Sequence, residues 1–187
     1  MSIIFISQPM PNGHSWTITS KLGNMLRQAE EKYGQRDYSY TILGVEFNQE
    51  EHPRIWYPGD CKHIVIQITM NCINDLNRAV FQVAHEAIHC LSPQGKNSAT
   101  VLEEGLASYF SSQYTLENGH GTWTCDKPKY REASNLVQKL LLIDPDIVKK
   151  IREVQPTISL IDKILILKTN PNIPIELADS LTLNFSE

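Results

Sequence analysis

The spacing of apolar residues over the first seventy positions switches between strand and helix periods. Ile3–Ser7 is a short apolar run before a Pro/Asn/Gly turn and predicts a strand. Residues 17–33 place apolar side chains three or four positions apart and stop at Gly34, which predicts an amphipathic helix. Residues 38–47 and 61–70 are rich in β-branched and aromatic side chains and predict two further strands.

The strand predicted at 61–70 alternates regularly. Ile64, Ile66, Ile68 and Met70 face one side, and the intervening row His63, Val65, Gln67 and Thr69 faces the other. Two placements remain open for this strand. At an exposed sheet edge it could pair with an extended peptide, with His63 and Gln67 facing away from the isoleucines. Inside the sheet it would be an ordinary half-buried strand.

Helical periods dominate from Asn74 onward. They predict helices at about 75–91, 100–114, 129–143, 146–154 and 157–168, with a short helix near the end. The order of elements predicts an α+β fold in a single domain, 1–187. Its mixed α/β lobe, about 1–91, would carry a small sheet, and its all-helical lobe would cover about 92–187.

The composition and charge of the chain exclude some classes of protein and partner. The chain is 41% hydrophobic and 20% charged, which is typical of a globular domain. Its formal net charge of -4, without a cluster of Lys and Arg, argues against nucleic acid as a partner. The start MSIIFISQPMPNG lacks the features of a signal peptide, and no membrane span is visible. We therefore expect a cytoplasmic protein, with export that leaves no N-terminal signature still open.

The segment VAHEAIHC, residues 83–90, carries two histidines four positions apart. On a helix His85 and His89 share one face, so both imidazoles can reach a single ion at about 2.0–2.1 Å. Glu86 is rotated by about 100° and flanks that ion, where it can accept a proton from an activated water molecule. Two surface histidines are the simpler alternative. Apolar residues on nearly every side of the motif instead predict a buried helix, in which histidines need partners.

A catalytic zinc ion needs a third protein ligand. TVLEEGLASYF, residues 100–110, offers Glu103 and Glu104 about one turn after the chain reverses. Thr100 and Glu103 have the spacing of a capping box, in which Glu103 bonds back to the Thr100 amide, so Glu104 is favoured as the ligand. Gly105 costs about 1 kcal/mol relative to alanine inside a helix, which suggests close approach to the neighbouring helix of the hairpin and supports the choice of Glu104.

The four cysteines are dispersed and are expected to be reduced thiols. Cys61, Cys72 and Cys125 are weaker alternatives to Glu104 as the third ligand. Cys90 follows His89 directly, which places it on another face of the helix and makes a ligand role improbable.

HEAIH at 85–89 followed by EEGLA at 103–107 resembles the gluzincin branch of the zincin metallopeptidases. The resemblance covers about residues 62–110. It implies a zincin-like fold, one zinc ion (Zn2+) per chain on His85, His89 and Glu104, and peptide-bond hydrolysis with Glu86 as general base. The chain departs from the family where an acidic residue often orients a zinc-binding histidine, because Ser108 occupies that vicinity. No residues for recognising a substrate amino terminus are visible.

The oxyanion formed in peptide hydrolysis usually needs one further donor. Candidates are His120, Tyr109, Tyr114 and Tyr130; Tyr109 points away from the ligand and is expected in the core. His120 lies in the loop ENGHGTWTCDKP and either folds over the site or is a solvated loop histidine. The leading hypothesis is a zinc-dependent metallopeptidase acting on a peptide or protein. The alternative is a non-catalytic, zinc-containing peptide- or protein-binding module of the same fold.

Overall fold

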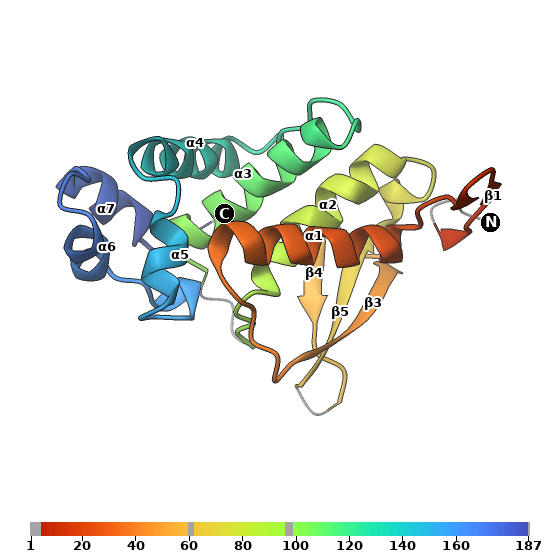
Figure 1. Ribbon diagram of the computed structural model, residues 1–187, viewed down its shortest axis with the longest axis horizontal. Coiled ribbons are helices and arrows are strands. Elements are labelled where there is room, and N and C mark those ends of the chain that lie inside the picture. The colour runs from red at the N-terminus through yellow and green to blue at the C-terminus, as the bar shows by residue number, and fades with distance from the viewer. Residues whose placement is uncertain (1–4, 60–61, 96–98, 187) are drawn as a thin grey trace.

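The computed structural model describes residues 5–59, 62–95 and 99–186, and it confirms a mixed arrangement of helix and strands up to β5, followed by helices (Figure 1). The strands are β1 (Pro9–Met10), β2 (Gly13–His14), β3 (Thr41–Asn48), β4 (Arg54–Trp56) and β5 (His63–Thr69). The helices are α1 (Ile18–Tyr33), α2 (Leu76–His89), α3 (Val101–Glu117), α4 (Pro128–Ile143), α5 (Ile147–Arg152), α6 (Lys163–Thr169) and α7 (Ile175–Leu181), with 3-10 turns η2 (Met70–Cys72) and η3 (Ile158–Leu160).

The predicted strand at Ile3–Ser7 is not borne out. Its first two residues lie outside the described ranges, and residues 5–7 are not strand. The short antiparallel pair β1–β2 follows instead, around the Pro/Asn/Gly turn. Cys61 also lies outside the described ranges.

β5 is the central strand of a three-stranded sheet with the order β3-β5-β4. It pairs in parallel with β3 and antiparallel with β4, and it is buried on both faces. The placement of β5 at an exposed edge is therefore wrong. Gln67, on the row opposite the isoleucines, bonds to Arg54 and Glu46 on the two flanking strands. The edge strands of this sheet are β3 and β4, and the three residues of β4 are too few to show a period in the sequence.

One face of the sheet is covered by α1 and α2, which lie side by side (Figure 1). Ile64, Ile66 and Ile68 of β5 are fully buried in the core that these elements share. Burial of three branched side chains at roughly 1.5–3 kcal/mol each holds α2 against the sheet. The sheet thus fixes the helix that carries the histidine motif.

The helical lobe is built on α3, which packs against both α2 and α4. The close approach expected at Gly105 is present, but the neighbour is α4 and not the preceding helix of the hairpin, α2. A Cβ atom at Gly105 would lie 2.4 Å from the Ala133 carbonyl oxygen. The helix expected at 157–168 is divided: η3 comes first, and α6 begins after Asp162, whose side chain accepts a hydrogen bond from the Leu165 amide.

A buried arginine ties the two lobes together. Arg152, at the end of α5, donates hydrogen bonds to the carbonyl oxygens of Tyr33, Gly34, Gln35 and Leu91. These carbonyls follow α1 and α2, so one guanidinium satisfies the backbone where both helices end.

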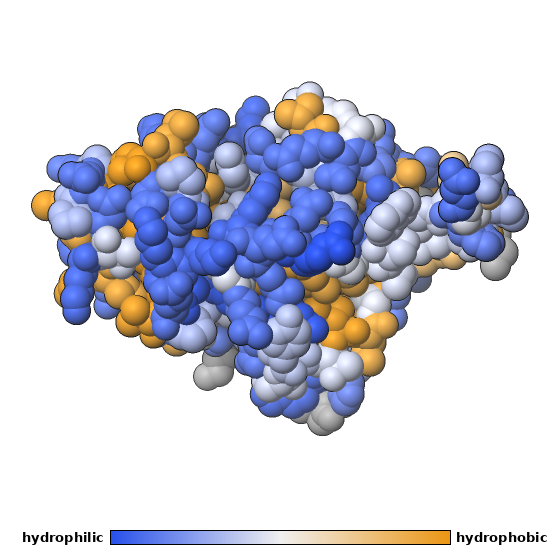
Figure 2. All heavy atoms as spheres, in the orientation of Figure 1, coloured by the Kyte–Doolittle hydropathy of each residue, from blue (hydrophilic) through white to orange (hydrophobic). Residues whose placement is uncertain are grey.

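The surface is mostly polar on the face shown in Figure 2, with apolar side chains gathered over parts of the helical lobe. None of the helices in the described ranges is both long enough and apolar enough to span a bilayer.

Candidate metal centre

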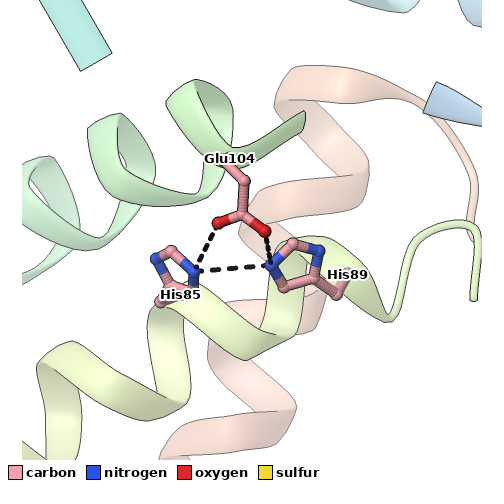
Figure 3. A group of neighbouring side chains, drawn as sticks. All are labelled: His85, His89 and Glu104. Carbon is pink, nitrogen blue, oxygen red and sulfur yellow. Dashed lines mark hydrogen bonds and ion pairs between the residues drawn. The ribbon is translucent and has the colours of Figure 1, made fainter. Parts of the chain in front are cut away.

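Two adjacent helices bring the three expected ligands together (Figure 3). His85 and His89 lie one turn apart on α2, and Glu104 reaches them from the first turn of α3. Glu104 Oε2 is 3.3 Å from His85 Nε2, Glu104 Oε1 is 3.6 Å from His89 Nε2, and the two Nε2 atoms are 3.4 Å apart. Across the described ranges, these are the His, Cys, Asp or Glu side chains that lie close enough together to hold a metal ion.

The spacing of these atoms fits a metal ion. Tetrahedral ligands at about 2.0–2.1 Å from an ion are roughly 3.3–3.4 Å from one another. The two Nε2 atoms are 3.4 Å apart, and each faces a different oxygen of the Glu104 carboxylate, at 3.3 Å from His85 and 3.6 Å from His89. Glu104 Oε2 is buried and accepts no hydrogen bond from the described part of the chain. A divalent cation would satisfy that oxygen, because it binds lone pairs of the carboxylate and of both imidazoles at once.

Glu103 contacts the second histidine directly. Its Oε1 lies 2.9 Å from His89 Nδ1, and the Glu103 side chain is buried. We assign the proton of neutral His89 to Nδ1, which leaves the Nε2 lone pair facing Glu104. The Thr100 hydroxyl does accept a hydrogen bond from the Glu103 amide, as in a capping box. The predicted return bond from Glu103 is wrong, however, because its carboxylate bonds to His89.

Glu103 also corrects the expectation that no acidic residue orients a ligand histidine. The sequence pattern did not reveal this role, because a glutamate three residues after Thr100 also has the spacing of a capping box. Ser108, which stands where the family has an acid, is buried and its Oγ has no hydrogen-bond partner among the described residues.

The centre is strongly anionic, because the carboxylates of Glu86, Glu103 and Glu104 surround two imidazoles. Burial by itself lowers the pKa of His89, but Glu104 and Glu103 outweigh burial and raise that pKa to about 10. Burial would raise the pKa of Glu104, yet His89 and His85 lower it to about 2. Such a cluster attracts positive charge, which protons or a divalent ion can supply.

Glu86 is almost completely buried beside this cluster, and it lines the same cleft as the two histidines. Burial raises the pKa of its carboxyl, while the nearby imidazoles of His89 and His85 oppose that shift. It is not one of the three converging ligands. Its position next to them matches the flanking role expected from a 100° rotation on the helix.

A cleft of about 780 Å³ contains the centre. One wall is formed by β4 and the residues that precede it, and α2 contributes the floor. The opposite wall consists of residues 123–127 and Tyr130 at the start of α4. This volume is in the range of pockets that bind peptides or drug-sized molecules.

Among the expected oxyanion donors, Tyr130 lies in this cleft, with its ring centroid 6.0 Å from that of His85. Tyr114 is buried elsewhere and donates a hydrogen bond to Asn24. Tyr109 packs against the core, as expected.

The expectation that His120 folds over the site is not supported. His120 lies outside the lining of the cleft, and its Nδ1 is 2.9 Å from Asn77 Oδ1 near the start of α2. It is buried, so the solvated alternative is also wrong. Its backbone amide bonds to the Thr115 carbonyl, which curls the loop back onto α3 and away from the histidines.

The three cysteines that the structure describes do not complete the centre. Cys72 is buried with its Sγ 3.2 Å from Gln82 Oε1, and Cys90 is buried on another face of α2, as expected. Cys125 lines the cleft but is not among the converging ligands.

Sequence reasoning overlooked three cleft residues, Arg78, Phe81 and Trp123. Arg78 and Phe81 precede His85 by seven and four positions, so helical periodicity already put them on its face. Trp123 gives no such signal, because only the fold of its loop brings it to α2.

Comparison of the chain with models of known protein families, with curated proteins and with solved structures gave no match. Function must therefore be inferred from the side chains of the cleft and their chemistry.

Proposed function

We propose that this protein is a zinc-dependent metallopeptidase with a zincin-like fold, of the gluzincin type. His85, His89 and Glu104 would hold one zinc ion. The observation that carries the proposal is the convergence of these three side chains inside a cleft that also contains the buried Glu86. The two imidazole Nε2 atoms are 3.4 Å apart, and one ligand atom from each of the three residues lies within 4.8 Å of the others. Two imidazoles and one carboxylate are a ligand set used by catalytic zinc sites.

A bound zinc ion supplies Lewis acidity that polarises a substrate carbonyl and lowers the pKa of a water molecule. Glu86 accepts the proton of that water and passes it to the leaving amine. A carboxyl whose pKa is raised by burial suits both transfers. Glu103 holds His89 in the orientation that presents Nε2.

The remaining walls suit a peptide substrate. Tyr130 stands beside His85, where its hydroxyl is a candidate donor to the oxyanion. β4 is an edge strand within the described sheet and its residues line the cleft. An extended peptide can add to this edge and bring its carbonyl groups past the metal ligands.

The test is the Glu86→Gln variant, compared with the wild type on a broad peptide library after loading with zinc. General bases contribute about 10²–10⁴-fold, so we expect kcat/KM to fall at least hundredfold. The zinc content should stay at one ion per chain, because Glu86 is not a ligand. His85→Ala should lose both zinc and cleavage.

Three results would overturn the proposal in different ways. A wild type that binds zinc but cleaves no library peptide would favour the non-catalytic peptide- or protein-binding module. Full activity in Glu86→Gln would exclude Glu86 as the base. Elemental analysis that finds no zinc after loading would remove the metal centre altogether.

A further inference from the structure

One face of α2 carries more than the metal ligands. Arg78, Phe81 and His85 follow one another at helical spacing and all line the cleft. At 1.5 Å of rise per residue, Phe81 lies about 6 Å and Arg78 about 10 Å from His85 along the helix axis. The two side chains therefore extend the floor of the cleft away from the metal centre, toward the start of α2.

Trp123 covers this part of the floor. Its ring centroid is 6.1 Å from that of Phe81, and the guanidinium carbon of Arg78 lies 5.5 Å from the Trp123 ring. Trp123 comes from the loop between α3 and α4, so the contact joins the two sides of the cleft. Stacking on an indole holds a guanidinium in place and leaves its edge able to form hydrogen bonds.

Only part of the hydrogen-bonding capacity of the Arg78 guanidinium is satisfied within the described part of the chain. Asp75 Oδ2 lies 3.4 Å from Arg78 Nε. The terminal nitrogens of Arg78 have no hydrogen-bond partner among the described residues, and 40% of its side chain is exposed. Two such nitrogens match the two oxygens of a carboxylate, which arginine binds in bidentate fashion.

We take the peptide to pair with β4 in the antiparallel sense, the commoner of the two pairings, and the sheet then sets its direction. A peptide antiparallel to β4 runs in the same direction as β5, because β4 and β5 are antiparallel. It would pass Trp56 first and Arg54 later, since these pair with Val65 and Gln67. β5 then ends at Thr69, whose amide bonds to Gln82 on the N-terminal half of α2. The C-terminal part of the peptide thus approaches Arg78.

We propose that Arg78, Phe81 and Trp123 form a subsite for a substrate carboxylate on the leaving-amine side of the scissile bond, an inference that rests on the proposed peptidase function. An extended chain advances about 3.3 Å per residue, so a 10 Å offset corresponds to two or three residues beyond the bond. The carboxylate is either the C-terminus of a short peptide or an acidic side chain of a longer one.

The experiment measures binding to the zinc-loaded Glu86→Gln protein, so that cleavage does not interfere. One pair of probes is acetyl-Ala-Ala-Ala-Phe-Ala as the free acid and as the amide. A second pair is acetyl-Ala-Ala-Ala-Phe-Glu-Ala-Ala amide and its Gln counterpart. Calorimetry gives Kd for each probe. We expect the charged member of at least one pair to bind about tenfold more tightly, the effect of a charge-assisted hydrogen bond.

Adding Arg78→Gln should bring the two members of that pair within twofold of each other, and Arg78→Lys should retain part of the preference. Arg131→Gln, on the exposed surface of α4 and outside the cleft, is the matched control and should change nothing. Trp123→Leu should weaken the charged probe because it removes the support of the guanidinium.

A preference in the first pair identifies a C-terminal carboxylate, and one in the second identifies an acidic side chain. Equal binding within both pairs, or a preference that survives Arg78→Gln, would overturn the subsite. If the wild type cleaves nothing while the preference depends on Arg78, the hydrolase proposal fails and the subsite stands. If the wild type cleaves peptides but shows no charge preference, the hydrolase proposal stands and the subsite fails.

Discussion

The contact between Glu103 and His89 gives the sharpest test of how the centre is organised. Glu103 Oε1 is 2.9 Å from His89 Nδ1, and the glutamate is 5% exposed, so water cannot replace it easily. Losing a carboxylate that orients a metal-binding histidine typically costs 10–100-fold in metal affinity. Glu103→Gln keeps an acceptor for the Nδ1 proton, so we expect zinc Kd to rise about tenfold. Glu103→Leu removes the acceptor and should raise it about a hundredfold, or roughly 2.7 kcal/mol.

The assay is a competitive zinc titration against a chromophoric chelator, with a thermal melt of each metal-free variant. Glu117→Gln, at the exposed end of the same helix, is the control and should leave Kd unchanged. Thr100→Ala removes the helix cap and should cost about 0.5–2 kcal/mol of stability without a comparable change in Kd. If Glu103→Leu binds zinc within twofold of the wild type, Glu103 serves the helix terminus and does not orient His89.

Two further substitutions test the packing and charges that support the cleft. Gly105→Ala should lower the free energy of unfolding by about 1–3 kcal/mol, because its Cβ would meet the Ala133 carbonyl oxygen at 2.4 Å. Gly23→Ala in α1 meets no atom within 4 Å and should instead stabilise the protein by up to about 1 kcal/mol, as chemical denaturation would show. Asp144→Asn tests a carboxyl whose pKa is lowered by the 2.8 Å contact with Lys150 and by Asn170. A lowered folded-state pKa stabilises the protein above the unfolded value near 4 and loses that effect as pH falls. Melts should therefore show Asp144→Asn about 1–2 kcal/mol less stable than the wild type at pH 7 and nearly equal at pH 3, because half-exposed Lys150 limits the gain. Asp146→Asn should show neither effect, and a deficit in Asp144→Asn that persists at pH 3 would contradict the charge-based account.

The local pattern of apolar and polar residues predicted the helices that carry the candidate metal centre. The helical period of α1, the capped start of α3 at Thr100 and the apolar flanks of the histidine motif are all short-range features, and the structure has these helices nearly as expected. The spacing of His85 and His89 also determines their common face without reference to the rest of the chain. Glu104 was predicted as their partner because the loop between the two helices reverses the chain, which places Glu104 at the level of the two histidines.

Long-range contacts decided the rest. β5 became the central strand only because β4, three residues long, pairs with it, and no period in three residues reveals such a strand. His120 lies away from the centre, where it contacts Asn77, forty-three positions earlier in the chain. Trp123 likewise contacts Arg78 through the tertiary fold, because the two residues are far apart in the sequence.

The sequence alone determined which side chains can share a helix face, because that depends only on the rise and rotation of the backbone between neighbouring residues. It therefore determined the pair of imidazoles and the carboxylate of Glu86 beside them. The tertiary structure decided which of two adjacent glutamates faces the imidazole nitrogens and which one supports His89 from behind. That choice depends on how α3 rotates against α2 and α4, and close packing around Gly105 sets this rotation.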